Sequence, residues 1–212
     1  MTSLSPKELL NRTELVLVRP DATRKDIQSL CLHARENNFR AVCVNSSRVT
    51  EAYILLEDTD VKLISTIGFP SGVADSDVKR YETEVAIDNG AQEFEFIPNL
   101  GQIKDVDEAK LLRELRDIVD AAEERPVSVL LGTKLLSRDE QILICNLAVE
   151  AGAKFLNAGN IDLETIKFLC ETLGKKFGLK VSGEIVDAET ADQLIAAGVT
   201  HFTTTLIPQF GN

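Results

Sequence analysis

The side chains able to do chemistry in this 212-residue chain are few, and most of them end or follow short apolar runs. Lys180 lies in LKVSGE, Glu95 in EFEFI, Asn157 in KFLNAGN and Lys134 in LLGTK. A neutral lysine amine attacks carbonyl carbons, whereas a charged lysine beside a carboxylate forms an ion pair and does not react. Which of these two states applies depends on the elements that position the residues.

Metal chemistry is less well supported by these residues. Glu95, Glu184 and Asn157 offer oxygen ligands, but neither histidine is expected at the carboxyl end of a strand, where the other candidates lie. His33 falls on a predicted helix and His201 at the beginning of the last predicted strand. The cysteines form no C-x-x-C pair and lie among apolar neighbours, which indicates buried, reduced thiols. They are Cys31, Cys43, Cys145 and Cys170.

Runs rich in β-branched residues alternate with amphipathic stretches, which is typical of a parallel sheet with crossover helices. Eight strands are predicted: Glu14–Val18, Ala41–Asn45, Val61–Gly68, Glu93–Ile97, Val127–Leu131, Lys154–Ala158, Leu179–Ser182 and His201–Thr205. Seven helices are predicted: Asp21–Asn38, Ser47–Leu56, Asp75–Asn89, Asp105–Glu123, Ser137–Ala151, Asp162–Lys176 and Asp187–Ala197. Eight regular units favour an α/β fold of the (β/α)8 TIM-barrel type over an open doubly wound sheet, which would carry G-x-G-x-x-G after its first strand.

The barrel is expected to be compact and to form one domain over residues 1–212, because its units are shorter than those of a usual ~250-residue barrel. LIPQFGN directly follows the last strand, so we expect the eighth helix to be short or missing. SPKELLNR, before the first strand, is predicted to be helical and to cover a seam or an end of the barrel. An uncovered apolar face would favour a homo-oligomer.

Three predicted helices are followed by a glycine that can adopt the left-handed conformation needed to end them. These glycines are Gly90, Gly152 and Gly198. At the other ends of the helices, Asp21, Ser137 and Asp187 have side-chain oxygens that can accept hydrogen bonds from free backbone amides. These residues set the expected boundaries.

Charge and hydropathy exclude several classes of function. The net charge is −11, and no cluster of Lys and Arg is present to contact phosphate backbones or anionic lipid, so neither a nucleic acid nor a membrane is an expected partner. The N-terminus lacks the apolar core of a signal peptide, and no apolar run reaches the ~20 residues that span a bilayer. A cytoplasmic protein is predicted.

Several segments together resemble the deoxyribose-phosphate aldolases. They are RPDAT (Arg19–Thr23), AVCVN (Ala41–Asn45), IGFPSG (Ile67–Gly72), the E-x-E-F-x-x-N-x-G segment (Glu93–Gly101), EAGAKF (Glu150–Phe155) and LKVSGEI (Leu179–Ile185). The resemblance covers nearly the whole chain in order. It implies a (β/α)8 barrel that makes and breaks a carbon–carbon bond through a Schiff base, with no metal or organic cofactor, on a small aldehyde or a sugar-derived ligand.

In that family a lysine on the sixth strand attacks the aldehyde, a lysine on the seventh lowers its pKa, and an aspartate on the fourth helps to move protons. In this chain Asn157 stands where the family has the nucleophilic lysine. Lys180 matches the second lysine, and Glu95 stands in place of the aspartate. An amide nitrogen cannot form an imine. Lys180 and Glu95 are expected to pair across the barrel, either as catalytic groups or as an ion pair.

The family's phosphate-binding turns are also altered. Gly183-Glu184 stands where the family has a G-G turn, Val186 where a basic residue commonly follows, and Thr203-Thr204-Thr205 in a small-residue segment. A carboxylate beside a dianion is unfavourable, so affinity for a sugar phosphate is expected to be weak. Gly183, Glu184 and Thr205 stay candidate substrate-binding residues.

Two positions complete the list of candidates. Cys43 matches a family cysteine and is either a reactive residue that contacts the substrate or a core residue. Lys134 is an amine near the expected mouth.

Two functions follow from these residues. The first is a divergent class I aldolase, a carbon–carbon lyase whose Schiff-base chemistry is lost or moved to Lys180 or Lys134. The alternative is a non-catalytic barrel that binds a small metabolite or a partner protein.

Overall fold

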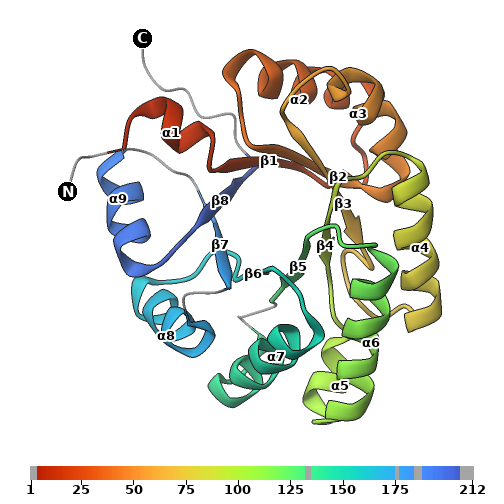
Figure 1. Ribbon diagram of the computed structural model, residues 1–212, viewed down its shortest axis with the longest axis vertical. Helices are drawn as coiled ribbons and strands as arrows, with labels where there is room; N and C mark the ends of the chain where they lie inside the picture. The colour runs from red at the N-terminus through yellow and green to blue at the C-terminus, as the bar shows by residue number, and fades with distance from the viewer. Residues whose placement is uncertain (1–3, 132–134, 175–176, 184–187, 206–212) are drawn as a thin grey trace.

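Eight parallel strands form one closed barrel in which each strand pairs with the next and β8 pairs with β1 (Figure 1). This computed structural model describes residues 4–131, 135–174, 177–183 and 188–205. The strands are β1 (Thr13–Leu17), β2 (Ala41–Asn45), β3 (Lys62–Ile67), β4 (Glu93–Phe96), β5 (Val127–Leu130), β6 (Phe155–Asn157), β7 (Gly178–Ser182) and β8 (His201–Thr204). Each overlaps its predicted run, which confirms the TIM-barrel fold.

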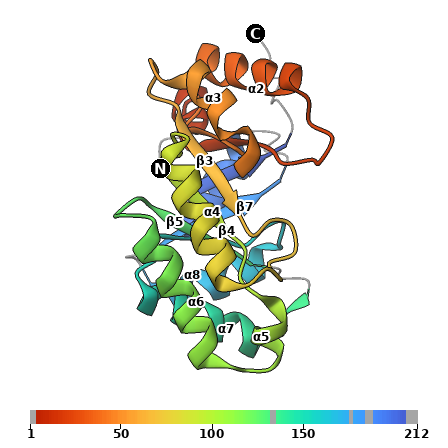
Figure 2. The ribbon, with the colours of Figure 1, turned by 90° about the vertical axis from the view of Figure 1, so that its right-hand side faces the viewer.

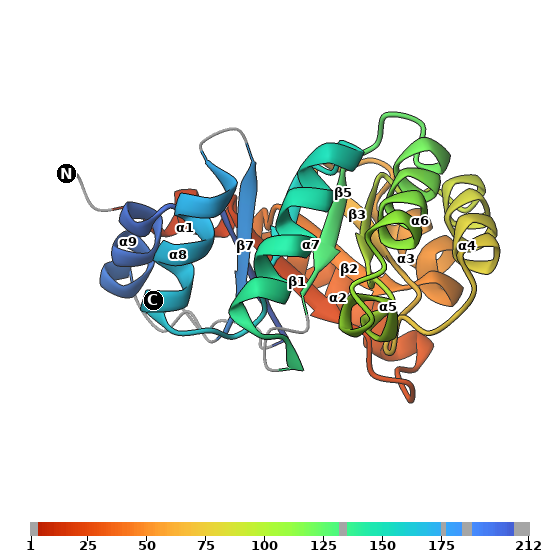
Figure 3. The ribbon, with the colours of Figure 1, turned by 90° about the horizontal axis from the view of Figure 1, so that it is seen from below.

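Helices surround the barrel. They are α1 (Pro6–Leu10), α2 (Arg24–Asn37), the 3-10 helix η1 (Ser46–Arg48), α3 (Val49–Leu56), α4 (Ser76–Asp88), α5 (Leu100–Lys104), α6 (Glu108–Ala121), α7 (Arg138–Ala151), α8 (Leu163–Leu173) and α9 (Ala188–Ala197). Figure 2 shows α4 and α6 next to each other along one side of the molecule. Figure 3 shows α8 and α9 beside β7, on the side of the barrel away from α4 and α6. None of the described helices is both long and apolar enough to span a membrane.

The local signals set most helix boundaries as predicted. Ser137 caps α7 by accepting from the Glu140 amide, and Gly152 ends that helix with φ 88°. Gly198 has φ 115°, and a Cβ there would lie 2.5 Å from Cys170 Sγ, so only glycine fits. The prediction for Asp21 was wrong because Thr23 is the N-cap of α2. Asp21 instead forms an exposed ion pair with Arg19. Asp187 lies outside the described residues.

The segment predicted as a helix over Asp105–Glu123 contains one helix, α6, and a short helix that was not predicted precedes it. This first helix, α5, begins where the Asn99 side chain accepts from the amides of the first turn. Val106 has φ 54°, a conformation that interrupts a helix. The second, α6, then begins under the Asp107 cap. The predicted helix therefore begins slightly too early, and the short helix before it was missed.

The N-terminal helix α1 lies beside the last helix and the first strand, as predicted for a segment that covers a seam. Its Leu9 is 1% exposed and belongs to the main apolar core. The backbone amide of Leu4 donates to Asp192 Oδ1 of α9 at 3.1 Å, which ties the two ends of the fold together. Residues 206–212 lie outside the described part of the chain, so the short or missing eighth helix stays a prediction.

The strands separate an apolar layer from a polar interior. Side chains such as Leu15, Val42 and Leu63 pack outward against the helices in the main core. Alternate residues point inward, and a separate small apolar cluster there contains Cys43 and Ile64. The rest of the interior is largely polar. Charged groups in such an interior are stabilised when they are paired with one another, because burial without a partner is unfavourable.

Candidate active site in the barrel mouth

A cavity of about 370 Å³ opens at the carboxyl ends of the strands, where TIM barrels carry their reactive residues. Its described lining is drawn from most of the strands and the loops after them. Those residues are Glu14, Val16, Val18, Cys43, Thr66, Phe69, Glu95, Leu130, Asn157, Asn160, Ser182, Gly183, Thr203, Thr204 and Thr205. The volume fits a small metabolite.

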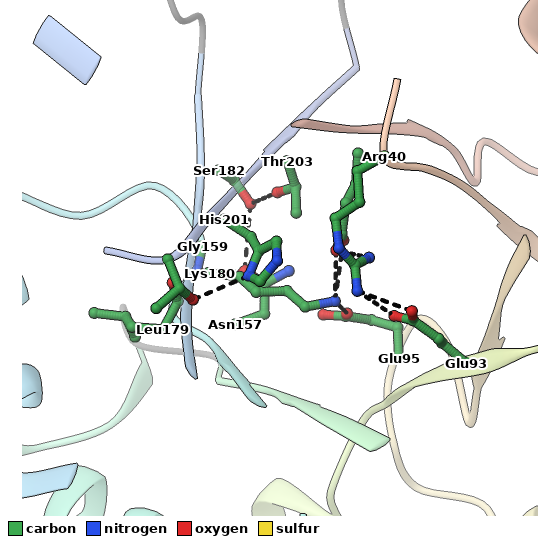
Figure 4. Close-up of polar contacts among 12 residues, drawn as sticks. Arg40, Glu93, Glu95, Asn157, Gly159, Leu179, Lys180, Ser182, His201 and Thr203 are labelled. Carbon is green, nitrogen blue, oxygen red and sulfur yellow. Dashed lines mark hydrogen bonds and ion pairs between the residues drawn. The ribbon is translucent and has the colours of Figure 1, made fainter. Parts of the chain in front are cut away.

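Lys180, in the middle of β7, extends across the barrel interior toward Glu95 and Arg40 (Figure 4). It is 0% exposed, and its Nζ lies 2.9 Å from Glu14 Oε1 and 3.0 Å from Glu14 Oε2. Burial by itself lowers the pKa of Lys180, but the carboxylates of Glu14 and Glu95 outweigh it and leave the pKa raised. The amine is therefore held as an ammonium ion.

Arg40 holds the other side of this network. It precedes β2 and donates to Glu14 Oε1 at 2.7 Å and to both oxygens of Glu93 at 2.8 and 2.9 Å. None of Arg40, Glu14 and Glu93 is predicted as a site residue from the sequence, because none lies at the carboxyl end of a strand. A signal was present: Glu93 and Glu95 are two residues apart on one strand, so they share a face.

Glu95 is the least satisfied member of the network. It is 5% exposed, its Oε2 lies 3.8 Å from Lys180 Nζ, and its buried Oε1 has no hydrogen-bond partner among the described residues. Burial raises the pKa of Glu95 to about 7, and Lys180 together with the nearby side chains of Asn157 and Ser128 offsets that rise only in part. The predicted pairing of Lys180 with Glu95 is thus present but long, since Glu14 is the closer partner.

Asn157 ends β6 and is 5% exposed. Its Oδ1 accepts from the Gly159 amide at 3.0 Å and lies 3.5 Å from Ser182 Oγ. Ser182 also shares a 2.6 Å hydrogen bond with Thr203 Oγ1 (Figure 4). Asn157 therefore belongs to a chain of neutral polar groups that joins β6, β7 and β8 beside the cavity.

The other predicted residues fall at different places. Cys43, Gly183 and Thr205 line the cavity. Burial raises the pKa of Cys43 well above its ordinary value, and the nearby Glu95 and Glu14 raise it further, so its thiol is neutral. Glu184 and Lys134 lie outside the described residues.

His201 lies at the beginning of β8, away from the mouth, as expected. Burial lowers the pKa of His201 to about 3, and the neighbouring Arg40 and Lys180 lower it further. Lys154 is exposed, precedes β6 and does not belong to the described cavity lining. Among the described residues, no cluster of His, Cys, Asp and Glu could hold a metal ion.

Proteins of known name place this barrel in a family. The chain is 39% identical over 191 residues to a deoxyribose-phosphate aldolase from Alkaliphilus oremlandii, which covers 87% of this chain and 86% of the relative. It is 35% identical over 207 residues to a deoxyribose-phosphate aldolase from Natranaerobius thermophilus, covering 94% and 93%. The chain belongs to the deoxyribose-phosphate aldolase family. No protein-family model matches it.

Solved structures agree with this deoxyribose-phosphate aldolase assignment. A tetrameric deoxyribose phosphate aldolase from Aeropyrum pernix superposes with a TM-score of 0.86 at 27% identity, covering 96% of this chain and 89% of that one. The aldolase QR15 superposes with a TM-score of 0.87 at 27% identity, covering 93% and 91%. The class I aldolase fold inferred from the sequence motifs is thus confirmed.

Proposed function

We propose that this chain binds a small aldehyde or sugar-derived metabolite in the barrel mouth and no longer performs the Schiff-base chemistry of a deoxyribose-phosphate aldolase. The observation that carries the proposal is the state of Lys180, whose amine is buried and hydrogen-bonded to Glu14. Attack on a carbonyl needs a neutral amine. Asn157, at the end of β6, offers only an amide nitrogen, which is not basic.

Activating Lys180 would require its buried ammonium to lose a proton. Glu14 and Glu95 would then face each other inside the barrel without the charge that now lies between them. Removing one partner of a buried ion pair costs about 3–5 kcal/mol. This penalty opposes the neutral amine at working pH and supports a structural role for Lys180.

The cavity is also poorly suited to a phosphorylated sugar. Its described lining contains two carboxylates, those of Glu14 and Glu95, and no cationic side chain. A carboxylate at about 4 Å from a phosphate dianion repels it by a few kcal/mol at an effective dielectric constant near ~20. The hydroxyl and amide groups of the lining suit an unphosphorylated ligand instead.

Two measurements test this proposal together. The wild-type protein should leave 2-deoxyribose 5-phosphate uncleaved when acetaldehyde release is followed. Unphosphorylated 2-deoxyribose should raise the melting temperature, because a ligand that binds only the folded state stabilises it. Rapid cleavage of the sugar phosphate would overturn the proposed loss of Schiff-base chemistry. A melting temperature that 2-deoxyribose does not raise at any concentration would overturn the proposed binding role.

A matched pair of variants locates the binding. Leu130→Phe adds bulk to a residue that lines the cavity and should abolish the stabilisation by 2-deoxyribose. Leu163→Phe makes the same change at an exposed position on α8 and should leave that stabilisation intact. If 2-deoxyribose raises the melting temperatures of the two variants equally, the ligand does not bind in this cavity.

A further inference from the structure

Among the described residues, the barrel interior contains more negative than positive side chains. Glu14, Glu93 and Glu95 are buried there, and the described cations that pair with them are Arg40 and Lys180. With all five groups ionised, the network carries one uncompensated negative charge. A buried charge without a partner is unfavourable, so its position in the network matters.

The hydrogen bonds identify where that charge lies. Glu14 accepts from Arg40 through Oε1 and from Lys180 through Oε2. Glu93 accepts from Arg40 through both of its oxygens. Glu95 alone is incompletely satisfied, with Oε2 at 3.8 Å from Lys180 and Oε1 unpartnered among the described residues.

The unsatisfied carboxylate borders the cavity rather than closed protein. Glu95 lines it together with Glu14, while the hydroxyl groups of Thr66, Ser182 and Thr203 lie around the same space. Lys180, 3.8 Å from Glu95 Oε2, is buried behind the wall, and the described lining itself contains no positive side chain. When Glu95 is ionised, a ligand can supply what the lining leaves out: a donor at Oε1 and a positive charge.

We propose that the cavity binds a small organic cation, an amino alcohol whose ammonium group donates to Glu95 Oε1 while its hydroxyl groups hydrogen-bond to the threonine and serine side chains. This ligand class rests on the proposed non-covalent binding role. An ammonium ion brings the interior to three positive and three negative charges. A neutral polyol satisfies the hydrogen bond but leaves the charge imbalance, and a phosphate increases it.

The preference depends on pH through Glu95. The charged or titratable groups that face it are Lys180 on β7, Glu14 on β1 and Cys43 on β2. Burial raises the pKa of Glu95 to about 7. Above that value the carboxylate is ionised and attracts an ammonium ion, and below it the protonated form does not.

Serinol (2-amino-1,3-propanediol) and glycerol form a matched pair of probes, because they differ only in an ammonium group in place of a hydroxyl. Dissociation constants for both are measured by ligand-observed NMR or calorimetry at about pH 8 and about pH 6. Serinol should bind at least about tenfold more tightly than glycerol at the higher pH, and that ratio should fall toward one at the lower pH. A ratio near one at both values would overturn the proposed ligand class.

Variants separate this inference from the binding role on which it rests. Glu95→Gln keeps the shape of the side chain and should abolish the preference for serinol while glycerol still binds. Glu164→Gln makes the same change at an exposed position and should leave the preference intact. If glycerol and 2-deoxyribose bind but serinol has no advantage, only the ligand class is wrong. If no probe binds, the proposed function itself is wrong.

Discussion

Lys180 Nζ lies 2.9 and 3.0 Å from the two carboxylate oxygens of Glu14, and both side chains are buried in the barrel interior. This contact determines the chemistry available to the amine. We expect a lysine held in this way to stay an ammonium ion that organises carboxylates, without a lone pair for attack on a carbonyl.

Replacing the buried lysine should destabilise the fold. Lys180→Met leaves Glu14 with Arg40 alone and Glu95 with no cation within ion-pair distance among the described residues. We expect a loss of about 3–5 kcal/mol in the free energy of unfolding at neutral pH, measured by urea denaturation. The double variant Lys180→Met with Glu14→Gln should regain part of that loss. A change below about 1 kcal/mol in the single variant would mean that water reaches the pair.

The dependence of stability on pH should carry the signature of Glu95. Its pKa is about 7 in the folded protein and is ordinarily 4.5, so the folded state binds the extra proton between these values. Stability contributed by this group therefore falls as pH rises from about 4.5 to about 7. His201 has the opposite effect: its pKa is lowered from 6.5 to about 3, so the stability it contributes rises as pH rises between these values.

The difference between wild type and Glu95→Gln isolates the glutamate from the histidine. The variant should gain stability relative to wild type as pH rises from about 5 to about 8, by no more than about 3 kcal/mol. Thermal unfolding of both proteins across this range measures the gain. A difference independent of pH would show that Glu95 keeps an ordinary pKa.

A second buried pair offers a test outside the site. Lys79 Nζ of α4 lies 2.6 Å from Glu114 Oε1 of α6 and also donates to the Ile97 carbonyl at 3.1 Å. Lys79→Met should cost about 3–5 kcal/mol of unfolding free energy, because Glu114 is left buried without its cation. Binding of 2-deoxyribose to the folded variant should be unchanged. Altered binding would mean that these two helices position the mouth.

Restoring the missing amine tests how far the pocket has diverged. Asn157→Lys places a lysine at the end of β6, where Lys180 lies on the neighbouring strand in register. The Lys180 ammonium should lower the pKa of the new lysine by like-charge repulsion and favour imine formation. We expect borohydride with acetaldehyde to give a stable adduct on this residue, detected by peptide mass spectrometry. An unmodified lysine would mean that the geometry for attack is lost as well.

The barrel could be predicted because its signals are local. Alternating β-branched and amphipathic runs located every strand, and Ser137 and Gly152 set the ends of α7. Thr23 and Asp107 show where this fails: the choice between neighbouring candidate caps depends on backbone geometry that hydropathy does not encode.

The site could be predicted only in part, because its decisive contacts are long-range. The sequence indicated Lys180, Glu95 and Asn157 at one end of the barrel, and the structure places Glu95 and Asn157 in the cavity wall with Lys180 behind them. The partner that fixes the charge of Lys180 is Glu14, 166 residues away in the chain. The spacing of residues in the sequence does not indicate whether Glu14 or Glu95 lies closer to the Lys180 amine.

The most direct test of the account is borohydride trapping on the wild-type protein. Incubation with acetaldehyde and borohydride, followed by intact-mass and peptide mass spectrometry, reports any lysine that forms an imine. We expect no site-specific adduct on the wild-type protein, with Lys180 unmodified under conditions that label the new lysine of Asn157→Lys. A stoichiometric adduct on Lys180 or Lys134 would contradict it, because an amine of the natural sequence would then be carrying out the family's chemistry.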